Sequence, residues 1–185
     1  RELGVVVSNC HRMPQSVFSE ETMSLDDCTE ALSKTVDAVR SINDKIQIIF
    51  TVSPYRYAKY GYHGSQLAKS VLLLAADSVC KCYPQCCHYF PSYEIVLDEL
   101  RDYRFYAEDM LHPSQQAIDY IWLRLVQTCF TPDARQYLKE YEPVRKGLLH
   151  RPQQYDKDRE AERTEALMAK AKEIWGRYGI CSGTE

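Results

Sequence analysis

The sequence predicts an α/β fold with a partial parallel sheet of about three strands and further helices toward the C-terminal end. Three observations support this fold class: strand and helix patterns alternate through the first hundred residues, the run 46–52 is almost continuously apolar, and only helical patterns follow residue 113. An apolar, β-branched run of this kind is typical of a strand buried on both faces of a parallel sheet. A chain of 185 residues is long enough for one domain with a substantial core.

The individual elements follow from local patterns. Ser24 is the expected N-cap of the first helix, because acidic residues fill the turn after it and apolar residues recur at helical spacing beyond. Pro91 interrupts the pattern of the last expected strand. In order, we expect a strand over 4–10, a helix over 25–43, a strand over 46–52, a buried helix over 67–79, a strand within 87–97 and a helix from about 114.

The last third of the chain is predicted to be helical. Thr131 is an expected N-cap with Pro132 at the first helical position. Beyond residue 152 the composition becomes highly charged, and an apolar stripe appears only later, before a stop at Gly179. We therefore predict two regions: 1–152, the C-terminal part of an α/β domain, and 153–185, a charged helical extension docked on it.

Composition narrows the classes of partner. The formal net charge is −3 and no basic stripe with interleaved aromatic residues is present, so nucleic acid is not an expected partner. No apolar run approaches the roughly 20 residues of a membrane span. The chain starts at Arg1 and enters an apolar run at once, which suggests a fragment of a longer protein. A partial sheet would expose an apolar edge and face, favouring self-association or pairing with the N-terminal part.

The cysteines allow two interpretations. Cys80, Cys82, Cys86 and Cys87 precede His88, which would suit a metal site by residue type. The pattern lacks the usual Cys-x2-Cys pairs, and Cys80 and Cys82 would diverge on a helix. We expect reduced, mostly buried thiols in a cytoplasmic protein, with no metal and no cofactor.

Asp109 and His112 form the most informative pair of polar residues. A neutral histidine can accept a proton near pH 7, and a carboxylate on its far ring nitrogen fixes the tautomer and stabilises the imidazolium. In a turn directly before a helix, the two side chains can face one pocket. Spacing alone leaves an alternative, in which Asp109 caps the turn and His112 packs at the helix start.

Other polar residues follow the predicted strands. Asn9 and His11 come after the first strand, and Ser53 and Arg56 after the second. Because ligands bind at the carboxyl ends of parallel strands, these four residues are candidates for substrate binding. Cys10 and Ser53 are disfavoured as nucleophiles, since no base is placed beside Cys10 and no Gly-x-Ser-x-Gly turn surrounds Ser53.

Charged residues alternate just before the Asp-x-x-His motif. Arg101 and Arg104 are interleaved with Asp98 and Asp102. We expect ion pairs between them that set the shape of this loop.

Two runs, 89–95 and 98–114, closely resemble the GSCFA family, which is similar to SGNH hydrolases. The segments 8–14 (Ser-Asn-Cys-His-Arg-Met-Pro) and 50–54 (Phe-Thr-Val-Ser-Pro) agree, and the resemblance spans residues 4–152. It implies a flavodoxin-like three-layer α/β/α sandwich. It also implies an ester hydrolase or acyltransferase that uses a Ser-His-Asp triad.

The resemblance assigns roles to individual residues. It implies that His112 is the general base and Asp109 its orienting partner. The family's serine motif is absent from this sequence, so the nucleophile is expected in a missing N-terminal portion and this chain alone is expected to be inactive. The implied substrate is a small acyl ester, for example an acylated carbohydrate. The alternative is a non-catalytic binding or interaction module on the same fold.

Two positions depart from the family pattern. Tyr57 stands where the family often has His, and Ser65 where it often has Asn. If these positions line the site, its polarity differs here; the alternative is ordinary loop variation.

Overall fold

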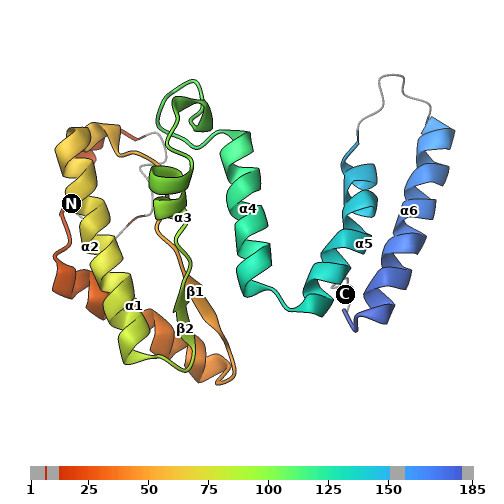
Figure 1. The fold of residues 1–185 in the computed structure, drawn as a ribbon, viewed down its shortest axis with the longest axis horizontal. Coiled ribbons are helices and arrows are strands. Elements are labelled where there is room, and N and C mark those ends of the chain that lie inside the picture. The colour runs from red at the N-terminus through yellow and green to blue at the C-terminus, as the bar shows by residue number, and fades with distance from the viewer. Residues whose placement is uncertain (1–6, 8–12, 151–156, 181–185) are drawn as a thin grey trace. The chain divides into compact units, whose positions relative to one another are not determined.

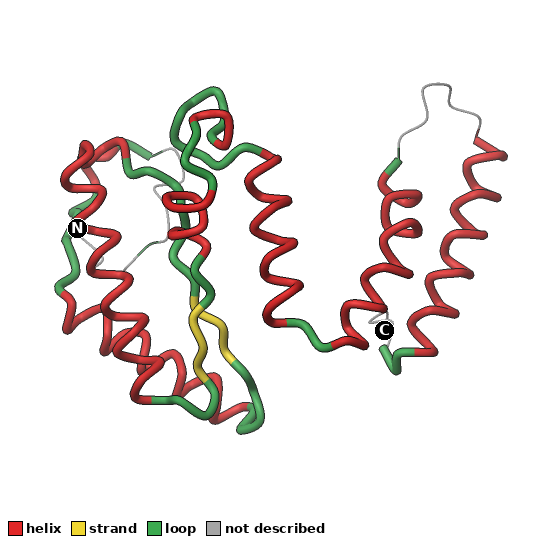
Figure 2. Tube along the Cα trace, viewed as in Figure 1, coloured by secondary structure: helices red, strands yellow, loops and turns green. Residues whose placement is uncertain are grey.

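The computed structural model of the chain describes residue 7 and residues 13–150 and 157–180 (Figure 1). The described residues are mainly helical and contain one two-stranded parallel sheet (Figure 2). The chain divides into two compact units, residues 1–118 and residues 119–185. The predicted strand over 4–10, apart from residue 7, lies outside the described residues.

The first helix, α1 (Leu25–Ile42), begins where the sequence predicts. The Ser24 hydroxyl accepts a hydrogen bond from the Asp27 backbone N–H at 3.1 Å, and the Ser24 N–H donates to the Asp27 carboxylate at 3.0 Å. This reciprocal pair satisfies two backbone donors that would otherwise be unpaired at the helix start. The predicted N-cap is confirmed.

The sheet consists of β1 (Ile48–Phe50) and β2 (Cys87–Tyr89), which run parallel. Helices α1 and α2 (Gly61–Cys82) pack on one face, where Ile48 and Phe50 join a core that contains Val36 and Val79. Ile49 points to the opposite face and is 43% exposed. The prediction that this strand is buried on both faces is therefore wrong for the described residues, because the two helices cover only one face.

The strand expected within 87–97 is present as β2, and the chain after it is helical. The strand ends at Tyr89, and α3 (Ser92–Glu94) continues directly into a π-helical turn, Ile95–Glu99. Pro91 explains the change, because it has no N–H for a strand ladder and its fixed φ suits a helix start. The helical turn then buries Ile95, Val96 and Leu100 on one side.

The second unit begins within α4 (Gln115–Cys129), and α5 (Pro132–Leu149) follows. The Thr131 hydroxyl accepts from the Ala134 N–H at 3.1 Å, which confirms the predicted N-cap. Among the described residues, no helix is long and apolar enough to cross a membrane.

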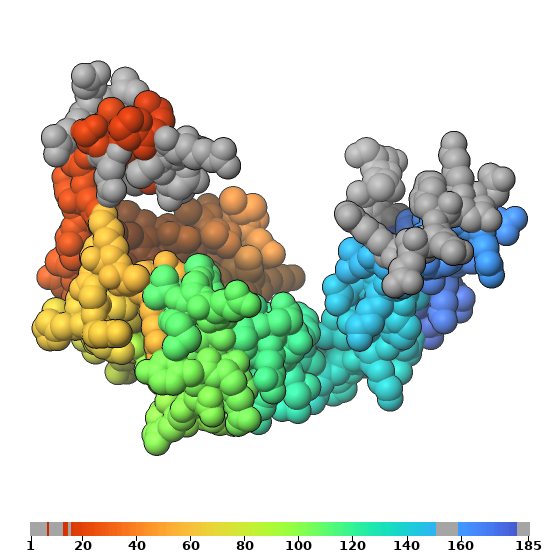
Figure 3. All heavy atoms as spheres, turned by 90° about the horizontal axis from the view of Figure 1, so that it is seen from above, coloured from red at the N-terminus to blue at the C-terminus, as the bar shows by residue number. Residues whose placement is uncertain are grey.

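Helix α6 (Lys157–Arg177) packs along α5, and atoms of the two helices adjoin in the space-filling view (Figure 3). Val144 of α5 is buried against Ala171 and Ile174 of α6. Gly179 ends the last helix with a φ of 65°. The apolar stripe and the stop predicted for this helix are thus confirmed, while the predicted domain boundary near residue 152 stays a prediction.

Candidate functional site

The Asp-x-x-His segment forms a tight hairpin directly before α4. The Ala107 N–H donates to the His112 carbonyl at 2.8 Å, and the Ser114 N–H donates to the Phe105 carbonyl at 2.8 Å. At the tip, Met110 has a φ of 60°, a left-handed conformation that is uncommon outside glycine. The hairpin therefore fixes the backbone on both sides of the two predicted catalytic residues.

Asp109 and His112 are joined through both carboxylate oxygens. Oδ1 accepts the backbone N–H groups of Leu111 at 2.9 Å and His112 at 3.0 Å, and Oδ2 lies 2.5 Å from the His112 Nδ1. These bonds, above all the His112 backbone N–H and then its ring, lower the pKa of Asp109 to about 2. An ionised Asp109 makes Nδ1 the donor, which leaves Nε2 of the neutral ring as a proton acceptor.

The His112 side chain is largely open to solvent. It is 61% exposed, and its ring packs against Tyr55 with the two centroids 4.5 Å apart. Within the described part of the chain, no hydroxyl or thiol hydrogen-bonds to Nε2. The geometry can thus provide a general base with its orienting carboxylate, and a nucleophile would have to come from elsewhere.

Arg56 connects the hairpin to the loop after β1. Its backbone N–H donates to the Leu111 carbonyl at 3.1 Å, and its guanidinium donates from Nη1 to the Met110 carbonyl at 3.3 Å. The same guanidinium lies 3.8 Å from the centroid of the Tyr106 ring. Arg56 therefore positions the Asp109–His112 turn, and its predicted role in substrate binding stays a prediction.

Lys69 of α2 is a functional candidate that the sequence reasoning missed. It is only 1% exposed, and its ammonium donates to the Ser53 carbonyl at 2.6 Å and lies 4.0 Å from the centroid of the Tyr57 ring. Burial lowers the pKa of this ammonium. The sequence does show a lysine within a largely apolar helix. A lysine in such a helix is equally often exposed to solvent, so this pattern alone did not indicate that Lys69 is buried.

The two departures from the family pattern meet in the loop after β1. The Tyr57 backbone N–H donates to the Ser65 hydroxyl at 3.1 Å, so Ser65 holds the loop at the start of α2. The Ser53 hydroxyl accepts from the Tyr55 N–H at 3.2 Å, which is a local turn contact. Ser53 therefore stabilises the loop that carries Tyr55 and Arg56, and its predicted contact with substrate stays a prediction.

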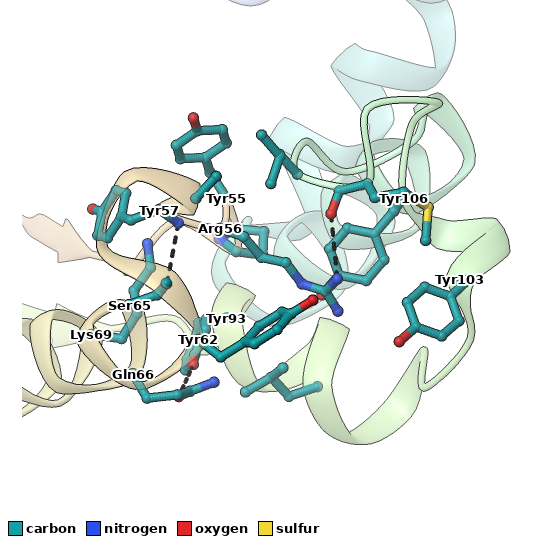
Figure 4. Close-up of a pocket in the computed structure, with 16 residues that line it drawn as sticks. Tyr55, Arg56, Tyr57, Tyr62, Ser65, Gln66, Lys69, Tyr93, Tyr103 and Tyr106 are labelled. Atoms are coloured by element: carbon teal, nitrogen blue, oxygen red, sulfur yellow. Dashed lines mark hydrogen bonds between the residues drawn. The ribbon is translucent and has the colours of Figure 1, made fainter.

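A pocket of about 700 Å³ lies between this loop, the start of α2 and the segment 103–111. In Figure 4, Ser65, Gln66 and Lys69 form one side, Tyr103 and Tyr106 the other, and Arg56 reaches between them. The pocket follows the carboxyl end of β1, where parallel sheets usually bind ligands. Its lining includes six tyrosines: Tyr55, Tyr57, Tyr62, Tyr93, Tyr103 and Tyr106.

The remaining predicted residues have mixed outcomes. Asn9 and His11 lie outside the described residues. The expected ion pairs are confirmed: Asp98 with Arg101 at 3.1 Å, and Asp102 with Arg104 at 3.7 Å.

The cysteines in the described ranges are free thiols, and Cys28, Cys86 and Cys87 are buried. Burial raises the pKa of Cys87 to about 11. The described part of the chain brings no three His, Cys, Asp or Glu side chains into an arrangement that could hold a metal ion.

A parallel sheet with a ligand-sized pocket near its carboxyl edge and an Asp–His pair on an adjoining turn define an α/β protein with a candidate catalytic or binding site. The GSCFA family model matches residues 1–125, more than half of the chain, and the chain belongs to this family. The matched part includes the sheet, the pocket and the Asp109–His112 turn. The chain matches no functionally curated protein and no solved structure.

Proposed function

We propose that the protein is an ester hydrolase or acyltransferase of the SGNH type and that this chain supplies the base half of its Ser-His-Asp triad. The observation that supports the proposal most strongly is the 2.5 Å hydrogen bond between Asp109 Oδ2 and His112 Nδ1. With Nδ1 donating to the ionised Asp109, Nε2 of the neutral ring is left as the acceptor, and the His112 side chain is 61% exposed.

In the proposed reaction, His112 Nε2 accepts the proton of a serine hydroxyl as the serine oxygen attacks the acyl carbonyl. The imidazolium then returns this proton to the leaving alcohol, and the same steps in reverse transfer the acyl group to water or to another alcohol. Asp109 stays ionised throughout and stabilises the imidazolium. This chemistry needs no cofactor.

The serine and the oxyanion-hole donors are proposed to come from chain outside the described residues. The described sheet would then be part of a larger three-layer α/β/α sandwich of the kind that the family resemblance implies. A small acyl ester, such as an acylated carbohydrate, remains the proposed substrate, and a cytoplasmic location remains a prediction.

The test is hydrolysis of short p-nitrophenyl esters by a protein that includes the complete GSCFA domain. His112→Ala should lower kcat by about 10⁴- to 10⁶-fold, since loss of the base disables the whole triad. His63→Ala is the matched control, because His63 is an exposed histidine that does not line the pocket. If His112→Ala and His63→Ala hydrolyse the esters at equal rates, the assignment of His112 is wrong.

A non-catalytic binding module is the alternative function. It is favoured by one observation: no described nucleophile contacts His112. The enzyme and the binding module predict different coding sequences ahead of Arg1. A Gly-Ser-Cys-Phe-Ala-like motif there supports the enzyme, and a gene without it supports the binding module.

A further inference from the structure

Two positively charged side chains line the pocket beside the Asp109–His112 turn. Among the residues that the structure describes, Arg56 and Lys69 both line it, and no aspartate or glutamate does. In the described part of the chain, neither cation forms an ion pair with a carboxylate. Two unneutralised positive charges that line one pocket create a potential that favours a bound anion.

Lys69 is the stronger of the two indications. Its side chain is 1% exposed, and the ammonium hydrogen-bonds to the Ser53 carbonyl at 2.6 Å. The rings of Tyr57 and Tyr93 lie 4.0 and 5.8 Å from it. An ammonium has three donors, and burying it without a counter-ion is unfavourable. An anion in the adjoining pocket would reduce this cost.

Arg56 provides the more accessible charge. One of its guanidinium N–H groups is used by the Met110 carbonyl, while the guanidinium has five donors in all. The planar group is held in place over the Tyr106 ring, so its orientation is already fixed before a ligand arrives. A preorganised guanidinium is well suited to carboxylate or phosphate oxygens.

Aromatic side chains complete the lining. Tyr93 is almost fully buried, whereas Tyr62 and Tyr103 are 91% and 65% exposed although they line the pocket. Exposed tyrosines at a concave site can stack against a flat or apolar ring face. The pocket thus combines two cationic groups that suit an anion with surfaces for a ring.

We propose that this pocket binds a small anionic molecule that carries a ring, with its carboxylate or phosphate oxygens toward Arg56 and Lys69 and the ring among the tyrosines. That the pocket is a substrate subsite rests on the proposed function, in which the ester attacked beside His112 would be anionic. The binding itself does not depend on catalysis.

The test compares three ligands that differ only in the group on a benzene ring: benzoate, phenyl phosphate and benzamide. Amide chemical shifts of the full chain are followed by NMR during each titration. The better of the two anions should bind at least about tenfold more tightly than benzamide, since a hydrogen bond to a charged group contributes about 1.5–3 kcal/mol. The ratio between benzoate and phenyl phosphate identifies the preferred anion. Equal affinities for all three ligands, or no binding of either anion, would overturn the proposal.

Two lysine variants test whether the preference for anions over benzamide arises in this pocket. Lys69→Met keeps the length of the side chain, removes the charge, and should bring the affinity of the anion to within about threefold of that of benzamide. Lys45→Met removes an exposed charge that does not line the pocket and should leave the discrimination unchanged. If Lys69→Met and Lys45→Met reduce the discrimination between the anion and benzamide equally, the pocket is not the anion site. Should Lys69→Met not fold, the comparison of ligands on the unaltered protein still decides.

His112→Ala separates this inference from the proposed function. The variant should bind the anions like the unaltered protein even though it cannot hydrolyse esters. If the unaltered protein with the complete GSCFA domain discriminates the anions but does not hydrolyse esters, the proposed function alone is contradicted. If it hydrolyses esters without discriminating the anions, the anion site alone is contradicted.

Discussion

Replacing Arg56 by Met should loosen the Asp109–His112 turn without unfolding the protein. The change removes the hydrogen bond to the Met110 carbonyl, which at 3.3 Å is long, and the contact with the Tyr106 ring at 3.8 Å. We assign about 1.5 kcal/mol to the first, the low end for a charged donor, and about 0.5 kcal/mol to the second, which is partly exposed. Together these give about 2 kcal/mol, or about a 30-fold increase in local opening.

Amide hydrogen exchange measures this opening directly. The Ala107 N–H is the most useful probe, because it donates to the His112 carbonyl at 2.8 Å across the base of the hairpin. In the Arg56→Met variant its exchange should be about 30-fold faster under conditions where exchange follows the opening equilibrium. Amides in α1 should exchange at their former rates, because the change is local.

Arg104→Met is the matched control for this experiment. Arg104 lies on the same segment, but its contacts are local: an ion pair with Asp102 at 3.7 Å and the Phe105 ring at 5.0 Å. An exposed ion pair of this kind contributes little, so exchange at Ala107 should change by less than about threefold. If the Arg56→Met variant also changes exchange at Ala107 by less than about threefold, Arg56 does not hold the turn in place.

Two further predictions concern acid and the second unit. The pKa of Asp109 in the fold is about 2, below its usual value of 3.8. The stabilisation that the Asp109 carboxylate gives the turn is therefore complete above pH 3.8 and is lost as the pH falls toward 2. NMR titration should show the Leu111 amide losing its bond over that range, and a midpoint at or above 3.8 would contradict the geometry. Ile174→Ala should lower the free energy of unfolding by about 2–5 kcal/mol in urea denaturation, because the side chain is 2% exposed. Ile180→Ala, at a residue 40% exposed, should cost less than about 1 kcal/mol, and equal losses would contradict the packing of α5 and α6.

Features set by neighbouring residues could be predicted from the sequence. Ser24 and Asp27 are three residues apart, and so are Asp109 and His112, so each pair is visible as a local pattern. Thr131 followed by Pro132 similarly marks the start of α5. Such short-range contacts depend on one turn of backbone and require no knowledge of the rest of the fold.

Features set by contacts between distant segments could not be predicted. Arg56 and Met110 are 54 residues apart, and nothing local indicates that a guanidinium after one strand supports a carbonyl in the later turn. Lys69 is buried against the loop after β1 and near the Tyr93 ring, which lie far from it in the sequence. The exposure of Ile49 likewise depends on which face the helices cover, whereas its apolar surroundings in the sequence indicated burial.

Met110 restricts which sequences can adopt this turn. With a φ of 60°, the chain reverses so that one carboxylate oxygen of Asp109 meets two successive backbone N–H groups. Glycine or asparagine would adopt this conformation readily, whereas valine or isoleucine would be strained by about 1–2 kcal/mol. The residue type one position after the aspartate is therefore a simple filter for related chains: those with a β-branched residue there are expected to hold their Asp-x-x-His motif in a different geometry.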